Sequence, residues 1–373
     1  MWAFPVLAVA FLIAIPLFVW NATAAILNST DGDFGEIVID PSQPGYFTYV
    51  SATPSHLTLG VDEAGNLVMV AIIGLGPNDE GGSILLLNPK TILGDGETIA
   101  SMFASGGVDE VDRSLRDFLT IGFTSVNTMS ASNWDVYVDL VSPLSVDLDI
   151  SSYETAVDEV SLGPESECCL YEGTTQLNSD EVGRFLSNSE DDESGQLRHI
   201  RQELFWKIWI EAISTGNDAA LLPGEVDSGF GRMVWGLSRG EVVVVQISQS
   251  MKPEGTYVDS EIVIDAVLDM VPFPLPNNPG ARTTVRLLDG VGGLDLAGDY
   301  SAGLVRAGAQ IVILGNASEF GKGTELIYHD DENAELVEEY QEMLGGGEIF
   351  FEPLTDAAVE VTIIVGDDLI GGK

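Results

Sequence analysis

Basic residues are scarce in this chain of 373 residues, which has 15 Lys and Arg against 59 Asp and Glu and a formal net charge of −44. A nucleic-acid-binding protein needs a cluster of Lys and Arg to contact phosphates, so this scarcity excludes that class of partner. Hydrophobic residues, by contrast, make up 45% of the chain, too many for a disordered acidic tail. The sequence therefore predicts a folded protein, and its length favours two domains.

Cysteine and histidine are also scarce. The two cysteines, Cys168 and Cys169, are adjacent and cannot join distant segments, which excludes a framework of disulfides. The three histidines, His56, His199 and His329, are isolated from one another and form no metal-binding motif. The sequence therefore predicts no transition-metal site.

Charge of either sign is absent from Trp2 to Leu27, and Lys90 is the first basic residue of the chain. A helix over this segment, at ~1.5 Å per residue, is longer than the ~30 Å hydrocarbon core of a membrane. We predict a single-pass membrane anchor over residues 1–27, with the acidic remainder outside the cell. A cleaved signal peptide is the alternative, because the small residues at 22–25 resemble a cleavage region.

Hydrophobic patterns divide the rest of the chain. Residues 28–50 are predicted to be a polar spacer. Over 51–271, short apolar runs alternate with amphipathic segments such as Arg198–Ser214, which predicts an α/β fold, an α/β/α sandwich. Four prolines within 272–280 predict a stiff linker. Residues 281–373 then predict a small α+β domain.

Two glycine-containing motifs suggest catalytic loops but fail on their context. Gly290–Gly293 follows a predicted strand, yet Asp295 occupies the third glycine position of a dinucleotide-binding motif. Gly236–Gly240 matches the G-x-S-x-G of hydrolases, but the predicted strand Glu241–Ile247 follows where that motif requires a helix. We interpret the first as a β–α turn and the second as a turn between two strands.

Because cations are few, a pair of them is informative. Arg198 and Arg201 are three residues apart on a predicted helix and share a face, beside Gln202. One interpretation is that they balance the acidic loop at residues 190–193. The other is a clamp for a diphosphate, since guanidinium groups bind phosphate oxygens through paired hydrogen bonds.

Two parts of the chain resemble known bacterial envelope proteins. Residues 284–369, with VRLLDGVGGLDLAGDYSAGLVRAGAQIVILGNASEF and AVEVTIIVGDDL, resemble the LytR C-terminal domain found especially in actinobacteria. Upstream, ASGGVDEVDRSLRDFL, WDVYVDLVSPLSVDL and RHIRQ resemble a diverged LytR-CpsA-Psr domain. The resemblance implies membrane anchoring with the catalytic-type domain outside. It also implies Mg²⁺ and arginines that hold an isoprenyl diphosphate while its glycopolymer is transferred to peptidoglycan.

The chain departs from that family at charged positions. It has Pro89-Lys90-Thr91 where the family has Pro-Arg-Asp-Thr, and Ser187 and Ser189 where the family has arginines. The resemblance leaves four candidate diphosphate-binding residues: Lys90, Arg198, Arg201 and Gln202. Transfer needs several cations and a carboxylate to hold metal or accept a proton, so these losses predict a site that binds and does not catalyse.

The sequence therefore predicts a non-catalytic or regulatory envelope protein without catalytic residues. Its predicted partners are a wall glycopolymer, an isoprenyl diphosphate lipid carrier or another protein, and Mg²⁺ is the one cofactor that the resemblance implies. The alternative is a Mg²⁺-dependent phosphotransferase that attaches glycopolymers from an isoprenyl diphosphate to peptidoglycan.

Overall fold

The computed structural model describes most of the chain, over residues 38–94, 96–148, 173–188, 195–252, 255–354 and 357–369. Several predicted features lie outside these ranges: the anchor, residues 28–37 of the spacer, both cysteines, Ser189 and the acidic loop at 190–193. Within the ranges, no helix is both long enough and apolar enough to cross a membrane. The predicted mixture of strands and helices is confirmed.

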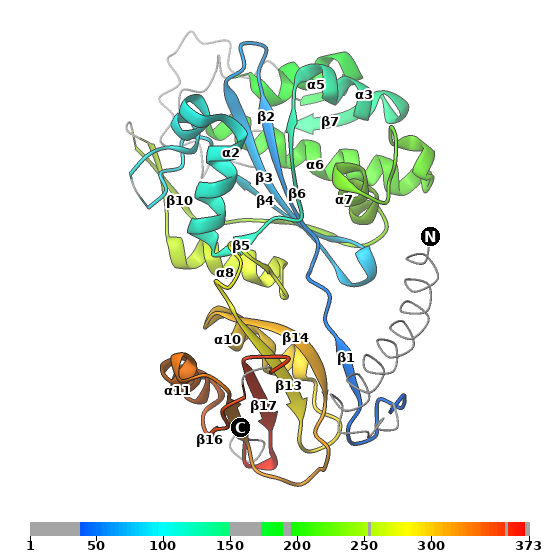
Figure 1. The fold of residues 1–373 in the computed structure, drawn as a ribbon. Coiled ribbons are helices and arrows are strands. Elements are labelled where there is room, and N and C mark those ends of the chain that lie inside the picture. Colours follow the sequence, from blue (N-terminus) through cyan, green and yellow to red (C-terminus); the bar gives the residue numbers. More distant parts are fainter. Residues whose placement is uncertain are drawn as a thin grey trace, which may run out of the picture.

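The larger domain is built on a mixed five-stranded sheet in the order β6-β2-β3-β4-β9. Its central strand β3 is antiparallel to β2 and β4, whereas β6 is parallel to β2 and β9 is parallel to β4. Figure 1 shows these strands with helices on both sides. The strands are β2 (Ser55–Val61), β3 (Leu67–Leu75), β4 (Gly82–Leu87), β6 (Ser125–Met129) and β9 (Val242–Val245).

Helices cover both faces of this sheet. One face is covered by α2 (Ile99–Leu119) and α8 (Ser260–Met270). The other is covered by α3 (Ala131–Val138), α5 (Ser179–Ser187), α6 (Gln196–Gly216) and α7 (Gly229–Ser238). Three two-stranded sheets complete the domain: β5 (Ile121–Gly122) with β12 (Leu275–Pro276), β7 (Leu144–Leu148) with β8 (Gly173–Leu177), and β10 (Gln249–Lys252) with β11 (Gly255–Val258).

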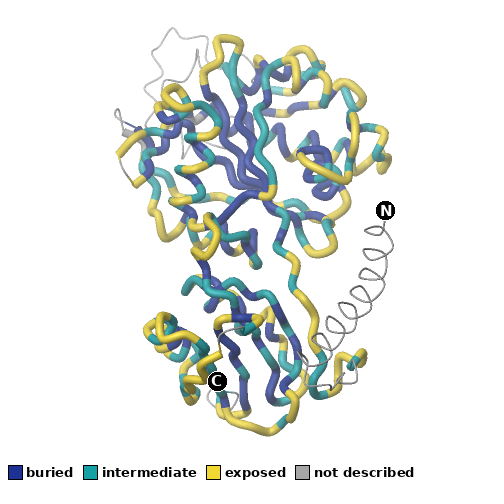
Figure 2. The backbone as a smooth tube through the Cα atoms, in the orientation of Figure 1, coloured by how far each residue is buried: buried dark blue, intermediate teal, exposed yellow. Residues whose placement is uncertain are grey.

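The central strand β3 is apolar throughout because it is buried on both faces. Val70 and Ile72 pack toward α2 and α8, whereas Ala71 and Ile73 pack toward the other four helices. Figure 2 shows the strands of this sheet as the most deeply buried part of the larger domain. The strand pattern therefore creates two cores, one on each side of the sheet.

Aromatic side chains fill the second core and fix α6 and α7 in place. The Trp134 ring meets Phe205 and Trp209 edge-on, with ring centroids 5.2 Å and 5.6 Å away. Phe230 of α7 stacks on Trp209 at 6.2 Å. Such pairs contribute ~0.5–1.5 kcal/mol beyond their buried area, so the two helices that border the sites described below are rigidly held.

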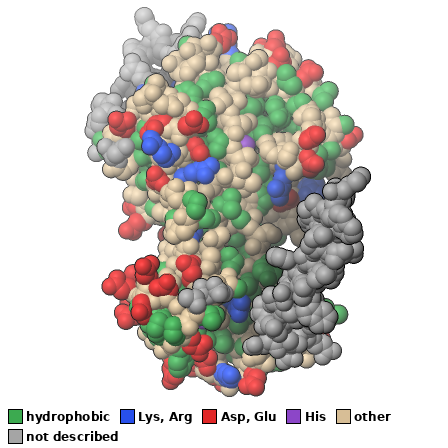
Figure 3. All heavy atoms as spheres, viewed as in Figure 1, with side chains coloured by type: hydrophobic (Ala, Val, Ile, Leu, Met, Phe, Trp, Pro, Cys, Tyr) green, Lys and Arg blue, Asp and Glu red, His purple; other side chains and the backbone are tan. Residues whose placement is uncertain are grey.

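The smaller domain is a six-stranded sheet in the order β1-β14-β13-β17-β15-β16. Figure 3 shows acidic side chains gathered over its helix α11, whose sequence is AELVEEYQEML. The strands are β1 (Phe47–Tyr49), β13 (Thr283–Asp289), β14 (Ala309–Asn316), β15 (Glu325–Tyr328), β16 (Glu348–Phe351) and β17 (Val361–Val365), and the helices are α9 (Leu296–Asp299), α10 (Ser301–Arg306) and α11 (Ala334–Leu344).

The first strand of the smaller sheet comes from the segment predicted to be a spacer. β1 runs antiparallel to β14, with Thr48 opposite Leu314. Beyond its two ends, the Val50 N–H donates to the Val312 carbonyl at 3.0 Å and the Asn316 N–H donates to the Tyr46 carbonyl at 2.7 Å. The spacer prediction for residues 28–50 thus differs from the structure at its C-terminal end, because three residues complete a sheet edge.

The segment predicted to be a linker also joins the two domains. Leu275 and Pro276 pair with Gly122 and Ile121 of the larger domain. Arg306 of α10 lies 2.7 Å from Asp265 and 2.9 Å from Asp269 of α8 through its Nε and Nη2 atoms. One cluster of buried hydrophobic residues includes members of both domains. Residues 272–280 therefore form a connection that is packed between the two domains.

Two helices differ from their predicted form. Hydrophobic spacing predicts a helix over Gly107–Leu119, but α2 begins at Ile99 because Gly107, with φ 68°, allows a kink between two helical parts. The residues predicted to form a turn at 236–240 instead end α7. The sequence also predicts a helix over Ser260–Met270, and α8 has these bounds.

Candidate functional site

A polar site lies where two parallel strands end. β4 and β9 run in the same direction, so residues 88–91 and 246–249 leave the sheet at the same edge. The start of α6 lies beside residue 88. An ideal Cβ placed on Gly195, the residue before α6, would be 3.2 Å from Asn88 Nδ2. The carboxyl ends of strands are where open α/β sheets bind ligands, and we call this place the β4 edge site.

Two donor groups converge in the β4 edge site. A Cβ on Gly195, the residue before α6, would also lie 3.0 Å from Arg198 Nη2, so this guanidinium and the Asn88 amide approach the same point. Gly195 has φ 83°, which favours glycine, and the side chains of Arg198 and Asn88 are both buried. A guanidinium and an amide are therefore held together at the first turn of a long helix, whose N-terminus adds partial positive charge.

Lys90 belongs to the same loop as Asn88. Its N–H donates to Asn88 Oδ1 at 2.9 Å, and its carbonyl accepts from the Thr256 N–H at 2.9 Å. Lys90 itself is exposed. The structure therefore places two of the predicted residues, Lys90 and Arg198, on segments that meet through Asn88.

The other two predicted residues have partners in the main chain. Arg201 Nε donates to the Phe185 carbonyl at 3.1 Å, and its Nη2 donates to the Asn188 carbonyl. Gln202 Nε2 donates to the carbonyls of Val68 and Leu186, each at 2.9 Å. Both side chains are buried. Their hydrogen bonds link α6 to the end of α5 and to β3, so both side chains position the helix.

A histidine and a carboxylate form a pair on α6 that sequence reasoning missed. His199 Nε2 lies 3.1 Å from Glu203 Oε1, and both side chains are largely buried. Burial raises the pKa of the Glu203 carboxyl, but hydrogen bonds from His199 and Gln246 and the charges of His199 and Lys207 outweigh it and lower that pKa. Glu203 is therefore ionised and holds the His199 ring from one side. The signal available in the sequence is the i, i+4 spacing within HIRQE.

Two buried polar atoms on the segments that form this site have no hydrogen-bond partner among the described residues. They are Thr91 Oγ1, next to Lys90, and His199 Nδ1. Most buried polar groups in proteins have a partner, and each exception calls for an explanation such as a ligand or water. His199 Nδ1 is the ring nitrogen that does not contact Glu203, so it is the one left to pair with a further polar group.

Metal ligands are not grouped at this site. In the ranges that the structure describes, no three His, Cys, Asp or Glu side chains come together as a metal centre. Mg²⁺ prefers carboxylates and other oxygens as ligands, and the described residues bring no group of three carboxylates together at the β4 edge site.

The two glycine motifs have structural roles. Ser238 of the G-x-S-x-G match is buried, and its Oγ donates to the Trp235 carbonyl at 2.8 Å, so it is not an exposed nucleophile. After β13, the Asp289 carboxylate accepts from the four N–H groups of residues 291–294 at 2.6–2.8 Å. The turn that we predict at Gly290–Gly293 is therefore closed by an internal carboxylate.

Comparison with protein families gives one match. Residues 282–369 match the family LytR_C, described as "LytR cell envelope-related transcriptional attenuator". The predicted resemblance of this part of the chain to the LytR C-terminal domain is thereby confirmed. A comparison of the whole sequence with curated proteins gives no match.

Comparison with solved structures gives matches of low sequence identity. TagT of B. subtilis is 16% identical, with a TM-score of 0.45 over 63% of this chain and 95% of its own. The structure described as LytR-CPS2A-psr family protein YwtF (TagT) with bound octaprenyl pyrophosphate lipid is 15% identical, with a TM-score of 0.43 over 64% and 95%. A transcriptional regulator from Enterococcus faecalis is 12% identical, with a TM-score of 0.43 over 61% and 90%.

Proposed function

We propose that this chain, whose residues 282–369 match the LytR_C family of cell-envelope-related proteins, is an envelope protein that binds a diphosphate-linked carrier without transferring its polymer. The binding site is the β4 edge site. The observation that carries this proposal is the convergence of Arg198 Nη2 and Asn88 Nδ2 on Gly195.

The donors at this site suit a phosphate group. A guanidinium and an amide supply directed N–H groups, and Lys90 adds a flexible charge from the same loop. The N-terminus of α6 contributes to the same positive field. Thr91 Oγ1 and His199 Nδ1 are polar atoms that a ligand oxygen or hydroxyl could pair with.

Binding without turnover follows from where the predicted cations lie. Arg201 donates to the carbonyls of Phe185 and Asn188, so its guanidinium positions α6. Among the predicted residues, the cations placed at the β4 edge site are then Lys90 and Arg198. Holding a ground-state diphosphate needs fewer cations than catalysis, which must stabilise charge that develops only in the transition state.

The transferase alternative is favoured by one observation, the His199–Glu203 pair. An ionised Glu203 orients the ring, and an accepting Nδ1 could take the proton of an attacking hydroxyl, as in other histidine–carboxylate pairs. In this alternative the polymer's phosphate would pass from the lipid diphosphate to that hydroxyl, and the leaving lipid phosphate would retain the charge that Arg198 binds.

Calorimetry with geranyl diphosphate tests the proposal. Replacing Arg198 by Gln removes one charged hydrogen bond, worth ~1.5–3 kcal/mol, so affinity should fall by roughly tenfold to a hundredfold. The matched control is Arg113→Gln, because Arg113 is exposed on α2 and pairs only with the neighbouring Glu110 among the described residues. Thermal unfolding of each variant shows whether it is folded, and titrations with and without Mg²⁺ show whether the metal contributes.

Two results would count against this function. Equal affinity of the wild type and Arg198→Gln for geranyl diphosphate would show that the ligand does not bind at the β4 edge site. A polymer-linked product formed by the wild type and lost in His199→Gln would establish the transferase.

The cellular location is proposed with the function. The apolar segment at residues 1–27 supports attachment to the cell membrane with both domains outside. Fractionation of cells and N-terminal sequencing test this: an intact N-terminus in the membrane fraction is expected, whereas soluble protein starting near Ala25 would mean a cleaved signal peptide.

A further inference from the structure

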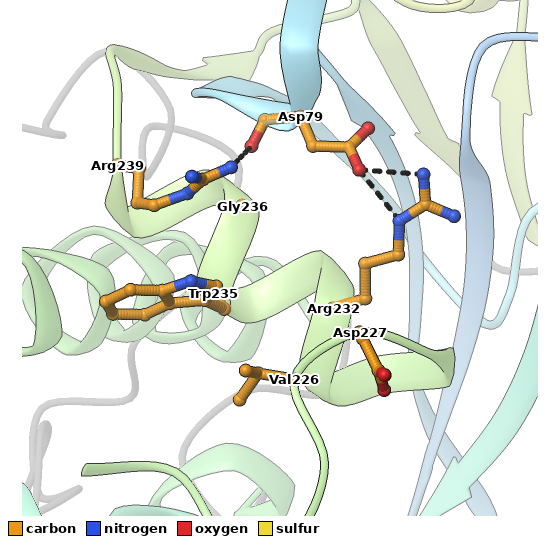
Figure 4. Close-up of a pocket in the computed structure, with 7 residues that line it drawn as sticks. All are labelled: Asp79, Val226, Asp227, Arg232, Trp235, Gly236 and Arg239. Carbon is orange, nitrogen blue, oxygen red and sulfur yellow. Dashed lines mark hydrogen bonds and ion pairs between the residues drawn. The ribbon is translucent and has the colours of Figure 1, made fainter. Parts of the chain in front are cut away.

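A second polar site lies at the opposite end of β4. The strand starts at Gly82, and Asn88 follows its end, so six residues at ~3.3 Å each separate the two places by about 20 Å. Figure 4 shows this second site, a cavity of about 290 Å³ between α7 and the loop that joins β3 to β4. It is lined by Asp79, Val226, Asp227, Arg232, Trp235, Gly236 and Arg239.

One face of α7 forms a wall of this cavity. Arg232, Trp235, Gly236 and Arg239 are spaced three, four and seven residues apart, which places them on the same side of the helix and its end. Figure 4 shows Trp235 below Arg239 on the left of the view, Arg232 on the right next to Asp227, and Val226 beneath the helix. Trp235 is half-buried and also packs against the second core, which fixes its ring.

The opposite wall is a strained loop that the two arginines hold. Asn78 and Asp79 have φ of 59° and 58°, which non-glycine residues seldom adopt. Arg232 Nε and Nη2 lie 2.9 Å and 2.7 Å from Asp79 Oδ2, and Arg239 Nη2 donates to the Asp79 carbonyl at 2.8 Å. Strain that the surroundings maintain is typical of ligand-binding positions.

Close contact between α7 and this loop keeps the cavity in one shape. The Gly81 N–H donates to the Gly236 carbonyl at 2.9 Å. A Cβ on Gly236 would lie 2.9 Å from the two Leu75 methyl carbons and 3.0 Å from the Asp79 carbonyl oxygen, so glycine is needed there. A cavity that is already formed avoids the ordering cost of binding.

The charges in the cavity select the chemical class of the ligand. Asp79 neutralises Arg232, Glu80 lies 3.6 Å from Arg239, and Asp227 adds a further carboxylate at the rim. Two carboxylates, Asp79 and Asp227, and two guanidiniums line the cavity among the described residues, so its charges balance, which disfavours a phosphate. Carboxylates that accept, guanidiniums that donate and a flat indole wall instead suit a neutral ring with many hydroxyl groups and an apolar face.

We propose that this cavity binds a neutral sugar ring of a polysaccharide. Its volume of about 290 Å³ lies just below the ~300–1,000 Å³ of sites for larger small molecules, which fits a single pyranose unit. The apolar face of the ring lies on Trp235, and its hydroxyls bond to Asp227 and the arginines. The site is separate from the β4 edge site, and its occupancy does not depend on the proposed diphosphate binding.

Titration with neutral oligosaccharides, followed by calorimetry and tryptophan fluorescence, tests this proposal. The probes are chitotetraose and maltotetraose, with inorganic phosphate as the charged competitor. Trp235→Ala should weaken sugar binding by about tenfold or more because the stacking wall is lost. Asp227→Asn should weaken it by about threefold to tenfold, whereas Trp235→Phe should retain most of the affinity.

The controls separate this site from the rest of the chain. Asp109→Asn makes the same chemical change as Asp227→Asn at a position of α2 far from the cavity, and it should leave the affinity unchanged. Arg198→Gln, which should weaken diphosphate binding, should leave sugar binding unchanged. Absence of binding by both oligosaccharides at millimolar concentration, unchanged affinity in both Trp235→Ala and Asp227→Asn, or displacement by phosphate would each overturn the proposal.

Discussion

Arg282 of the smaller domain donates two hydrogen bonds to Thr120 at the end of α2 in the larger one. Its Nε reaches the Thr120 carbonyl and its Nη2 the Thr120 hydroxyl, each at 3.2 Å. Its Nη1 donates to the carbonyls of Val305 and Ala309. One buried guanidinium thus satisfies acceptors in both domains, and Thr120 has a φ of 57° that this contact helps to hold.

Replacing Arg282 by Ala should weaken the association of the domains. The change leaves several acceptors without a donor, and the free energy of unfolding should fall by about 1–3 kcal/mol. Urea unfolding followed by fluorescence and circular dichroism measures the loss and shows whether the domains separate into two transitions. The exposed Arg113→Ala serves as control and should change stability by less than ~0.5 kcal/mol; an equal effect of both variants would contradict the role given to Arg282.

Proline in β1 should have an effect that depends on its position. Thr48 lies midway between the two hydrogen bonds at 46–316 and 50–312, so its N–H faces β14 whereas that of Tyr49 faces away. Thr48→Pro removes a donor from the ladder and should cost about 1–3 kcal/mol. Thermal unfolding of the full chain measures it, with Tyr49→Pro as the matched edge control. If both variants unfold at the same temperature, the pairing of β1 with β14 does not stabilise the sheet.

Burial of His56 makes stability depend on pH. The ring is 1% exposed and lies 2.6 Å from Ser125 Oγ and 3.0 Å from Asn127 Oδ1. Burial lowers its pKa from 6.5 to about 4, although the hydrogen bond to Asn127 raises it slightly. The unfolded chain therefore binds more protons between pH 6.5 and about 4, and stability falls as the pH falls through this window.

By pH 4, the lowered pKa of His56 should reduce the free energy of unfolding by about 3 kcal/mol. Urea unfolding at pH 7, 6, 5 and 4 should show it as a difference between the wild type and His56→Gln, because the carboxylates titrate in both. A difference that stays constant over this range would refute the assignment.

Asp289 should dominate the stability of the turn at residues 290–294. Burial raises the pKa of its carboxyl, but hydrogen bonds from four N–H groups outweigh burial and lower it below the usual value of 3.8. Its contribution is therefore complete above pH ~4 and is lost as the pH falls further. Asp289→Asn places an amide NH₂ against N–H donors and should cost about 1.5–3 kcal/mol at pH 7, measured by urea unfolding. Asp299→Asn, an exposed change on α9, should cost little, and equal losses in the two variants would contradict this role of Asp289.

Sequence patterns predict the elements whose periodicity is set by burial. α8 begins and ends as predicted because its apolar spacing and the cap by Asp259 agree. β3 is identified by its continuous apolar run, since both of its faces are buried. These features are local, so no partner needs to be known to find them.

Elements that depend on distant partners are not predicted. β1 is only three exposed residues, and its pairing with β14 joins segments far apart in the chain. α7 is missed because its glycines are typical of turns. In the structure, Gly231 is needed for close packing, since a Cβ there would lie 2.2 Å from the Glu225 carbonyl oxygen. In the site, the sequence finds Arg198 but not Asn88, because their proximity is created only when α6 packs at the end of β4.

The pairing of β1 with β14 makes the larger domain an insertion within the smaller one. The chain lays down one edge strand, builds the whole larger domain, and then returns to complete the sheet. A pulling force applied ahead of residue 38 therefore reaches the β1–β14 ladder before it reaches the larger domain.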